Sequence, residues 1–406
     1  MSSTEAGVAS GTLGTLGTWM REKRLLPGDS LRGDLELALM ALATVCVAGF
    51  FIIPHGRMHS FASYALALVV AVYLVLRPHL LRWSVKSRTL FFSILLLIYL
   101  SLSAVGSGEL ELVAYAGANA LLIVTFLFAL LLVVRSRPRS GFAITCITVA
   151  AAASAAAYYL LGSMNDDAAT AWGRLRTPTI AAMAFGSALV MALGGIVSCR
   201  SQRELILWIP AIALLSAACL ALAVDYVGFG VAIALLILSL ERGWQNRFGR
   251  QGAIWAVVAI ISLGVCAQLL TSVAAGPVAV WESVLSSAFE DAAILGAGIH
   301  VAGDVALACD GCDVDHAHSI YVSMLRHGGV IGLLLLTALV MFAISELTEA
   351  PASRLRTVGA GCLAYGLIVL VFDGDKLMPK IDFIWLLFWF PVGLVIALRP
   401  RRGRVA

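Results

Sequence analysis

Apolar runs of about twenty residues recur along most of this chain, and no other feature restricts its fold as strongly. A helix of that length crosses the hydrocarbon core of a bilayer. The chain has 406 residues, of which 61% are hydrophobic and 13% are charged, whereas soluble domains average about 45–50% apolar and about 25% charged residues. These values exclude a soluble globular protein, and the run lengths predict an all-α polytopic membrane protein.

Runs bounded by charged or turn residues predict about twelve transmembrane helices. They cover residues 35–53, 59–76, 89–105, 111–134, 141–162, 178–198, 205–223, 227–240, 252–271, 318–344, 355–372 and 382–398. We expect a single transmembrane domain over 34–398, with a polar cytoplasmic tail, 1–33, before it and a basic cytoplasmic tail, 399–406, after it.

The positions of the basic residues predict which side of the membrane each loop faces. If the N-terminus is cytoplasmic, 22 of the 28 lysines and arginines fall in cytoplasmic segments. The outer loops then hold only Arg57, Arg174, Arg176, Lys376 and Lys380, while Arg326 lies within a span. This asymmetry follows the positive-inside rule and requires an even number of spans, so both termini are expected in the cytoplasm. We expect the first span to act as an uncleaved signal anchor.

The longest predicted outer loop, 272–317, contains seven acidic residues and no Lys or Arg. Within it, apolar residues recur at helical spacing, namely Trp281, Val284, Leu285, Ala288 and Phe289. This pattern predicts a helix that lies flat on the outer membrane surface. Further along the loop, Cys309 and Cys312 favour a local disulfide on the oxidising side of the membrane. A zinc site that adds His316 or His318 is the alternative.

Four of the seven histidines fall between residues 300 and 327, where the loop ends and a predicted span begins. On helical spacing, Ser319, Ser323, Arg326 and His327 share one face of that span. Ionisable groups inside a span usually face a water-filled cavity or the interior of a helix bundle. The sequence therefore predicts an outward-opening cavity beside span 318–344. The alternative is that the histidines are interfacial and that Arg326 extends to the membrane surface.

The stretch HAHSIYVSMLRHGGVIGLL resembles the signature of the O-antigen ligase and O-antigen polymerase superfamily, with His318, Ser319, Gly329 and Gly332 at the matching positions. The pairing of Trp281 with the later ILGAGI turn is similar to that family's Trp-containing helix and glycine turn. The sequence GRLRTP at 173–178 is similar to its Gly-Arg element. The resemblance covers roughly residues 170–345.

This resemblance implies a GT-C-like glycosyltransferase of the bacterial inner membrane whose active site faces the periplasm. It implies inverting chemistry without a metal or cofactor, in which a glycan passes from undecaprenyl diphosphate to an acceptor hydroxyl. We expect O-antigen ligation onto lipid A-core, in lipopolysaccharide biosynthesis. The implied partners are the undecaprenyl-diphosphate-linked donor, the lipid A-core or growing-glycan acceptor and membrane lipids, and no nucleic acid.

In this scheme His318 is the general base, since a neutral imidazole accepts a proton near pH 7. Two family arginines that bind phosphate are replaced here, by DYVGFG at 225–230 and by Pro277. Other cations are therefore expected to bind the diphosphate, since its developing charge must be stabilised. The outward candidates are Arg174, Arg176 and Arg326, assisted by Lys376 or Lys380, and the supporting residues are His316, Asp315, Ser319 and Tyr321.

The sequence also fits other functions. A polymerase or a protein oligosaccharyltransferase would use the same chemistry with a different acceptor. A lipid-carrier flippase or a transporter is a different class, which twelve spans fit equally well. Transporters usually show interrupted helices and internal repeats, and the sequence shows no repeat.

Overall fold

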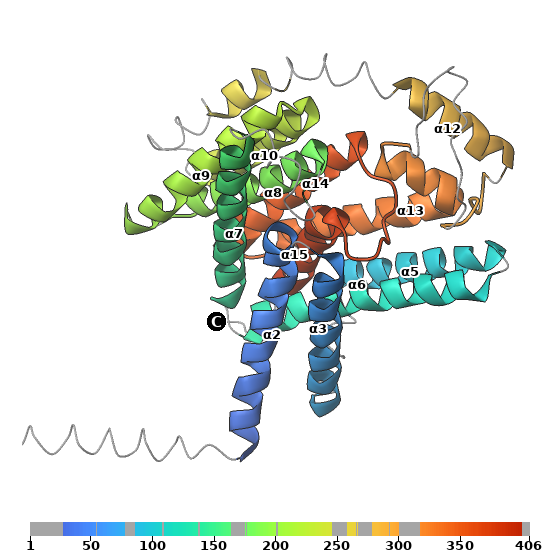
Figure 1. Cartoon of the computed structure of the whole chain (residues 1–406), viewed down its shortest axis with the longest axis horizontal. Coiled ribbons are helices and arrows are strands. Elements are labelled where there is room, and N and C mark those ends of the chain that lie inside the picture. The colour runs from blue at the N-terminus through green and yellow to red at the C-terminus, as the bar shows by residue number, and fades with distance from the viewer. Residues whose placement is uncertain are drawn as a thin grey trace, which may run out of the picture. The chain divides into compact units, whose positions relative to one another are not determined.

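The computed structural model describes residues 27–53, 55–77, 86–107, 109–136, 139–163, 175, 177–199, 202–245, 258–264, 266, 278–291, 293–299 and 317–399. Every regular element in these segments is a helix (Figure 1). The longer helices are α2 (Pro27–Ile52), α3 (Gly56–Leu76), α5 (Arg88–Ser103), α6 (Leu110–Ser136), α7 (Ser140–Ser163), α8 (Pro178–Val197), α9 (Gln202–Leu222), α10 (Asp225–Gln245), α12 (Val278–Asp291), α13 (Ile320–Glu349), α14 (Arg354–Phe372) and α15 (Phe390–Leu398). A 3-10 turn, η1 (Ala104–Ser107), follows α5, and a π-helical turn, η2 (Trp385–Trp389), precedes α15.

Among the described helices, seven contain segments long and apolar enough to cross a membrane. These segments are Gly33–Ile52, Gly56–Leu76, Leu110–Arg135, Ser140–Gly162, Pro178–Val197, Ile320–Glu349 and Arg354–Phe372. Shorter apolar helices cover Arg88–Ser103, Trp208–Leu222 and Trp385–Leu398. The described part of the chain thus has the fold of an α-helical membrane protein. Twelve crossings and two cytoplasmic termini stay predictions.

Eleven of the predicted span ranges coincide with described helices, and most of the range 252–271 lies outside the described residues. The chain divides into two compact units, Met1–Ala38 and Leu39–Ala406, with the division inside α2. The contacts described below all lie within the second unit.

Helix α8 packs against α7, α9, α10 and α14 through small side chains. At Gly186 a Cβ atom would overlap the hydroxyl of Tyr365 on α14. That hydroxyl donates a hydrogen bond of 2.9 Å to the carbonyl of Met183. Small residues let helix backbones approach closely in a membrane, where the hydrophobic effect contributes little between helices. Glycine at 186 is therefore what brings α14 against α8.

Helix α12 (Val278–Asp291) contains the residues of the predicted amphipathic helix. Val284 and Ala288 are buried, whereas Glu282 and Ser286 are exposed. Helix α12 packs on α13, and Trp281 lies 6.3 Å from Phe372 between ring centroids. The helix and its apolar face are confirmed, except that Phe289 is exposed. Its position on the membrane surface remains a prediction.

Helix α13 is interrupted at Gly329, which has φ 60° and ψ −165°. Backbone groups freed by this break pair with the segment 293–298, which we call the strap. The amides of Ala297 and Gly298 donate to the carbonyls of Arg326 and His327, at 2.8 and 3.0 Å. In return, the amides of Val330 and Ile331 donate to strap carbonyls at 2.9 and 3.3 Å. Irregular backbone at membrane depth is tolerated where such partners satisfy it.

Candidate functional site

A cavity of about 640 Å³ lies between the start of α8, the start of α10, His318 shortly before α13, and the segment that joins α14 to η2. His318, Tyr226, Asp373, Lys376 and Thr177 are among the residues that line it. These residues are distant in sequence, and helix packing brings them together. This cavity is the place where the predicted catalytic histidine meets other polar groups.

His318 stands directly before Ser319, the residue that precedes the first turn of α13. Its φ is 47°, a left-handed conformation that residues other than glycine rarely adopt. The Nδ1 atom lies 4.0 Å from Oδ1 of Asp373, and the His318 side chain is 43% exposed. The distance exceeds that of a hydrogen bond, so the contact is electrostatic. The imidazole therefore faces the cavity beside a carboxylate.

Asp373 has a second partner on another helix. The hydroxyl of Tyr226, in the first turn of α10, donates a hydrogen bond of 2.9 Å to Oδ2 of Asp373. Burial raises the pKa of this phenol, and the charge and hydrogen bond of Asp373 raise it further. Tyr226 therefore stays protonated as the donor, which leaves the Oδ1 atom of Asp373 directed at His318.

The segment 373–382 is held in place by tryptophans of the next helical turn. The indole nitrogen of Trp389 donates to the carbonyl of Leu377 at 2.9 Å, and that of Trp385 donates to Pro379 at 3.4 Å. Gly374 has φ 139°, which a residue with a side chain rarely adopts. These bonds fix the backbone that carries Asp373 and Lys376.

His327, one of the residues on the predicted polar face, is buried at the break in α13. Its Nδ1 atom lies 3.0 Å from the carbonyl oxygen of Gly298 in the strap. Its Nε2 atom lies 3.6 Å from Oδ1 of Asp375. Because Asp375 also lines the cavity, His327 connects the strap to the cavity wall.

The described cavity lining is acidic. Asp373, Asp375 and Asp382 contribute carboxylates, and Lys376 contributes the cation. Of the other cations expected to bind diphosphate, Arg326 and Lys380 are described but do not line this cavity. Arg174 and Arg176 lie outside the described residues.

The structure describes some of the remaining predicted site residues and not others. Ser319 is buried, without a side-chain hydrogen bond at the start of α13. Tyr321 donates to the carbonyl of Leu367 at 2.9 Å and so joins α13 to α14. The predicted residues Asp315, His316, Cys309 and Cys312, and with them the predicted disulfide or zinc site, lie outside the described residues. Within the described residues, no group of three or more His, Cys, Asp or Glu side chains is placed to hold a metal.

Sequence reasoning missed Asp373, Asp375 and Tyr226. In the segment DGDKLMPKID at 373–382, the lysines were selected as diphosphate ligands. Its aspartates, Asp373 and Asp375, are the residues that lie next to the histidines. Two aspartates around a glycine, directly after an apolar run, mark a polar turn at a helix end. The sequence does not indicate which histidine such a turn faces.

Protein-family models do not match this chain, and no curated protein aligns with it significantly.

Proposed function

We propose that the protein is a membrane glycosyltransferase that moves a glycan from undecaprenyl diphosphate to an acceptor hydroxyl, with His318 as general base. We further propose that it acts at the periplasmic face of a bacterial inner membrane, as an O-antigen ligase whose acceptor is lipid A-core. A polymerase, with a growing glycan as acceptor, is the variant with the same chemistry. The proposal extends the family resemblance of the sequence around His318.

The observation that carries the proposal is the pairing of His318 with Asp373 in a cavity large enough for sugar rings. Because Nδ1 faces the carboxylate, Nε2 is the nitrogen that would accept a proton. The acceptor O–H bond breaks and its proton goes to Nε2, while the oxygen attacks the anomeric carbon. The bond from that carbon to the phosphate oxygen breaks, and its electron pair leaves with the lipid diphosphate.

The leaving diphosphate needs positive charge nearby. Lys376 lines the cavity, and so does Thr177, which directly follows Arg176 in the sequence. We propose that Lys376, with Arg174 and Arg176, binds the diphosphate. The three aspartates of the lining make such cations more necessary, because carboxylates repel the donor.

The test is transfer by detergent-purified protein, measured as release of undecaprenyl diphosphate from a glycan-loaded carrier when acceptor is added. We expect His318→Ala to lower the rate by about 10²–10⁴-fold, the usual contribution of a general base. The matched control is His55→Ala, which removes an exposed histidine that caps no helix amide. Equal rates for the two variants would exclude His318 as the base. In cells that lack the gene, polymer accumulating on the carrier would favour a ligase, and single repeats on the finished lipid would favour a polymerase.

A lipid-carrier flippase or transporter is the second candidate, and the break in α13 at Gly329 is the observation that favours it. Transporters bind substrate at interrupted helices near the middle of the membrane. Here the strap already pairs with the backbone groups on both sides of the break, which argues against an open site at that point. A flippase would release no undecaprenyl diphosphate in the same assay.

A further inference from the structure

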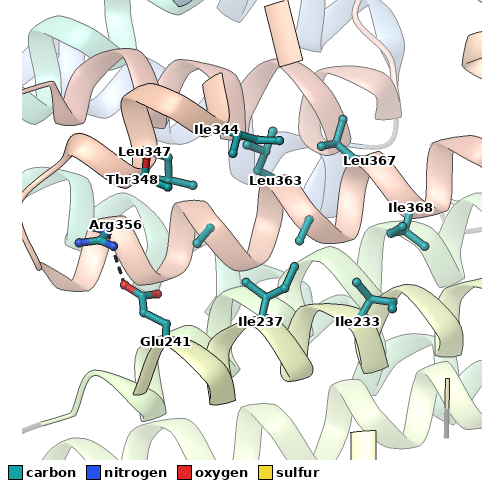
Figure 2. Close-up of a pocket in the computed structure, with 12 residues that line it drawn as sticks. Ile233, Ile237, Glu241, Ile344, Leu347, Thr348, Arg356, Leu363, Leu367 and Ile368 are labelled. Carbon is teal, nitrogen blue, oxygen red and sulfur yellow. Dashed lines mark ion pairs between the residues drawn. The ribbon is translucent and has the colours of Figure 1, made fainter. Parts of the chain in front are cut away.

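An apolar groove of about 390 Å³ lies between α10, α13 and α14, and its described lining shares no residue with that of the His318 cavity. Figure 2 shows Ile233 of α10 near Ile368 of α14, and Leu363 of α14 beside Ile344 of α13. Nearly all of the described side chains that line the groove are hydrocarbon. The polar ones, Glu241, Thr348 and Arg356, lie toward one end.

The groove has the length of one bilayer leaflet. Arg356 and Ile368 lie at its two ends on α14 (Figure 2), and twelve steps of 1.5 Å along the helix separate them by about 18 Å. The hydrocarbon core of a bilayer is about 30 Å thick, so one leaflet contributes about 15 Å. An acyl chain that begins near Arg356 therefore ends near Ile368.

The groove is too small to enclose a protein helix. A helix about 18 Å long and about 10 Å in diameter occupies roughly 1,400 Å³, more than the 910 Å³ of empty space in the groove. A helix would lie across the opening without filling it. A single hydrocarbon chain is the shape that fits between these walls.

The polar end of the groove carries an ion pair that leaves donors available. The Nε atom of Arg356 lies 3.4 Å from Oε1 of Glu241, and Nη1 donates to the carbonyl of Ala350 at 3.0 Å. Neither of these two described contacts of the guanidinium uses its Nη2 atom. Arginine binds phosphate oxygens well because its planar fork presents several N–H groups.

Other basic residues gather at the same ends of the helices. Arg354 lies two positions from Arg356 and stacks over Phe142, with its guanidinium carbon 5.0 Å from the ring centroid. Arg399, at the end of α15, pairs with Glu346 of α13 at 3.5 Å. The positive-inside pattern places these helix ends in the cytoplasm, where anionic lipids attract basic residues.

We propose that this groove binds one acyl chain of an anionic phospholipid, whose phosphate accepts hydrogen bonds from Arg356. Glu241 limits the affinity, because its carboxylate neutralises the guanidinium and repels the phosphate. The site is independent of the His318 cavity and of the proposed transfer activity.

Native mass spectrometry of the full chain in neutral detergent tests this, with phosphatidylglycerol and phosphatidylcholine of matched acyl chains as probes. We expect tighter binding of phosphatidylglycerol. Arg356→Gln should weaken that binding by about tenfold, as expected for the loss of one hydrogen bond to a charged group. Glu241→Gln should strengthen it and widen the preference for the anionic lipid. The opposite signs matter, because a purely structural ion pair would weaken binding in both variants.

Two further variants complete the test. Arg57→Gln, which removes an exposed arginine in the first turn of α3, is the matched control and should leave both affinities unchanged. Ala364→Phe fills the groove and should reduce the binding of both lipids. If Arg356→Gln does not fold, Glu241→Gln decides the question. Equal affinity for the two lipids, or weaker phosphatidylglycerol binding by Glu241→Gln, would overturn the proposal. A change of oligomeric state with Ala364→Phe, with lipid binding intact, would indicate a second copy of the chain as occupant and also overturn it.

Discussion

The backbone of Gly296 lies directly against the backbone of Gly329, so closely that a Cβ atom on either residue would overlap the other. Both have positive φ, 77° and 60°, which side chains strongly disfavour. This contact is what allows the strap to fill the break in α13.

We therefore expect Gly329→Ala to destabilise the protein by about 2–4 kcal/mol, from backbone strain and overlap together. The control is Gly117→Ala on α6, where a new Cβ meets no atom within 4 Å. That change should be neutral or stabilise the helix by up to about 1 kcal/mol. Thermal unfolding of the two variants in detergent measures the difference, and similar melting temperatures would contradict the close contact.

A second glycine prediction concerns the packing of α14 on the π-helical turn. A Cβ at Gly366 would overlap the carbonyl oxygen of Leu387, which the backbone holds in place. Gly359, on the same helix, has its nearest neighbours at 3.7 to 3.9 Å, an ordinary contact distance. Gly366→Ala should therefore reduce the yield of folded protein in size-exclusion chromatography, while Gly359→Ala should not. Equal yields of the two variants would contradict the close contact between Gly366 and Leu387.

A buried glutamate and an exposed one on α13 provide a third comparison. Glu346 is 1% exposed, and its carboxylate accepts from the Ser87 hydroxyl and the Arg88 amide, both at 2.8 Å. Glu349 forms an exposed ion pair with Arg88 at 3.0 Å. We expect Glu346→Ala to cost about 3–5 kcal/mol, since buried donors lose their partner, and Glu349→Ala to cost less than about 1 kcal/mol. Thermal unfolding distinguishes them, and equal losses would contradict the burial of Glu346.

The pairing of His318 with Asp373 makes a kinetic prediction. We expect Asp373→Asn to lower the transfer rate by about tenfold or more while the donor KM changes little, because the carboxylate acts through the imidazole. The double variant His318→Ala with Asp373→Asn should be no slower than His318→Ala alone, since residues that act as a unit are not additive. If the loss in the double variant equals the product of the two single losses, the two residues act independently. Tyr226→Phe should give a smaller loss, because it removes the hydrogen bond but leaves the Asp373 carboxylate.

The expected sidedness is testable with single cysteines and a membrane-impermeant maleimide. Lys380→Cys should react in spheroplasts, and Lys86→Cys should react only after the membrane is opened, if both termini are cytoplasmic. Both positions are exposed. The wild-type chain, which contains native cysteines, gives the background. Reversed labelling would invert the topology and place His318 in the cytoplasm.

Much of the fold could be predicted locally. The range 59–76 becomes α3 and the range 355–372 becomes α14, because each is an apolar run of spanning length. The helix around Trp281 was predictable from spacing, since burying one face needs only a period of 3.6 residues. The sequence predicted a cavity beside span 318–344 from the face that carries Ser319, Ser323, Arg326 and His327. The cavity that the structure describes is lined by His318 and by none of those four residues.

Hydropathy and spacing by themselves determined that this chain forms membrane helices, because each helix satisfies its own backbone and its run length is a local property. They did not determine which residues meet. Asp373 reaches His318 only because α14 ends beside the start of α13, and Arg356 closes an apolar groove only because α10 packs on α14. Such contacts depend on the close approach of helices far apart in sequence, so only the tertiary structure decided them.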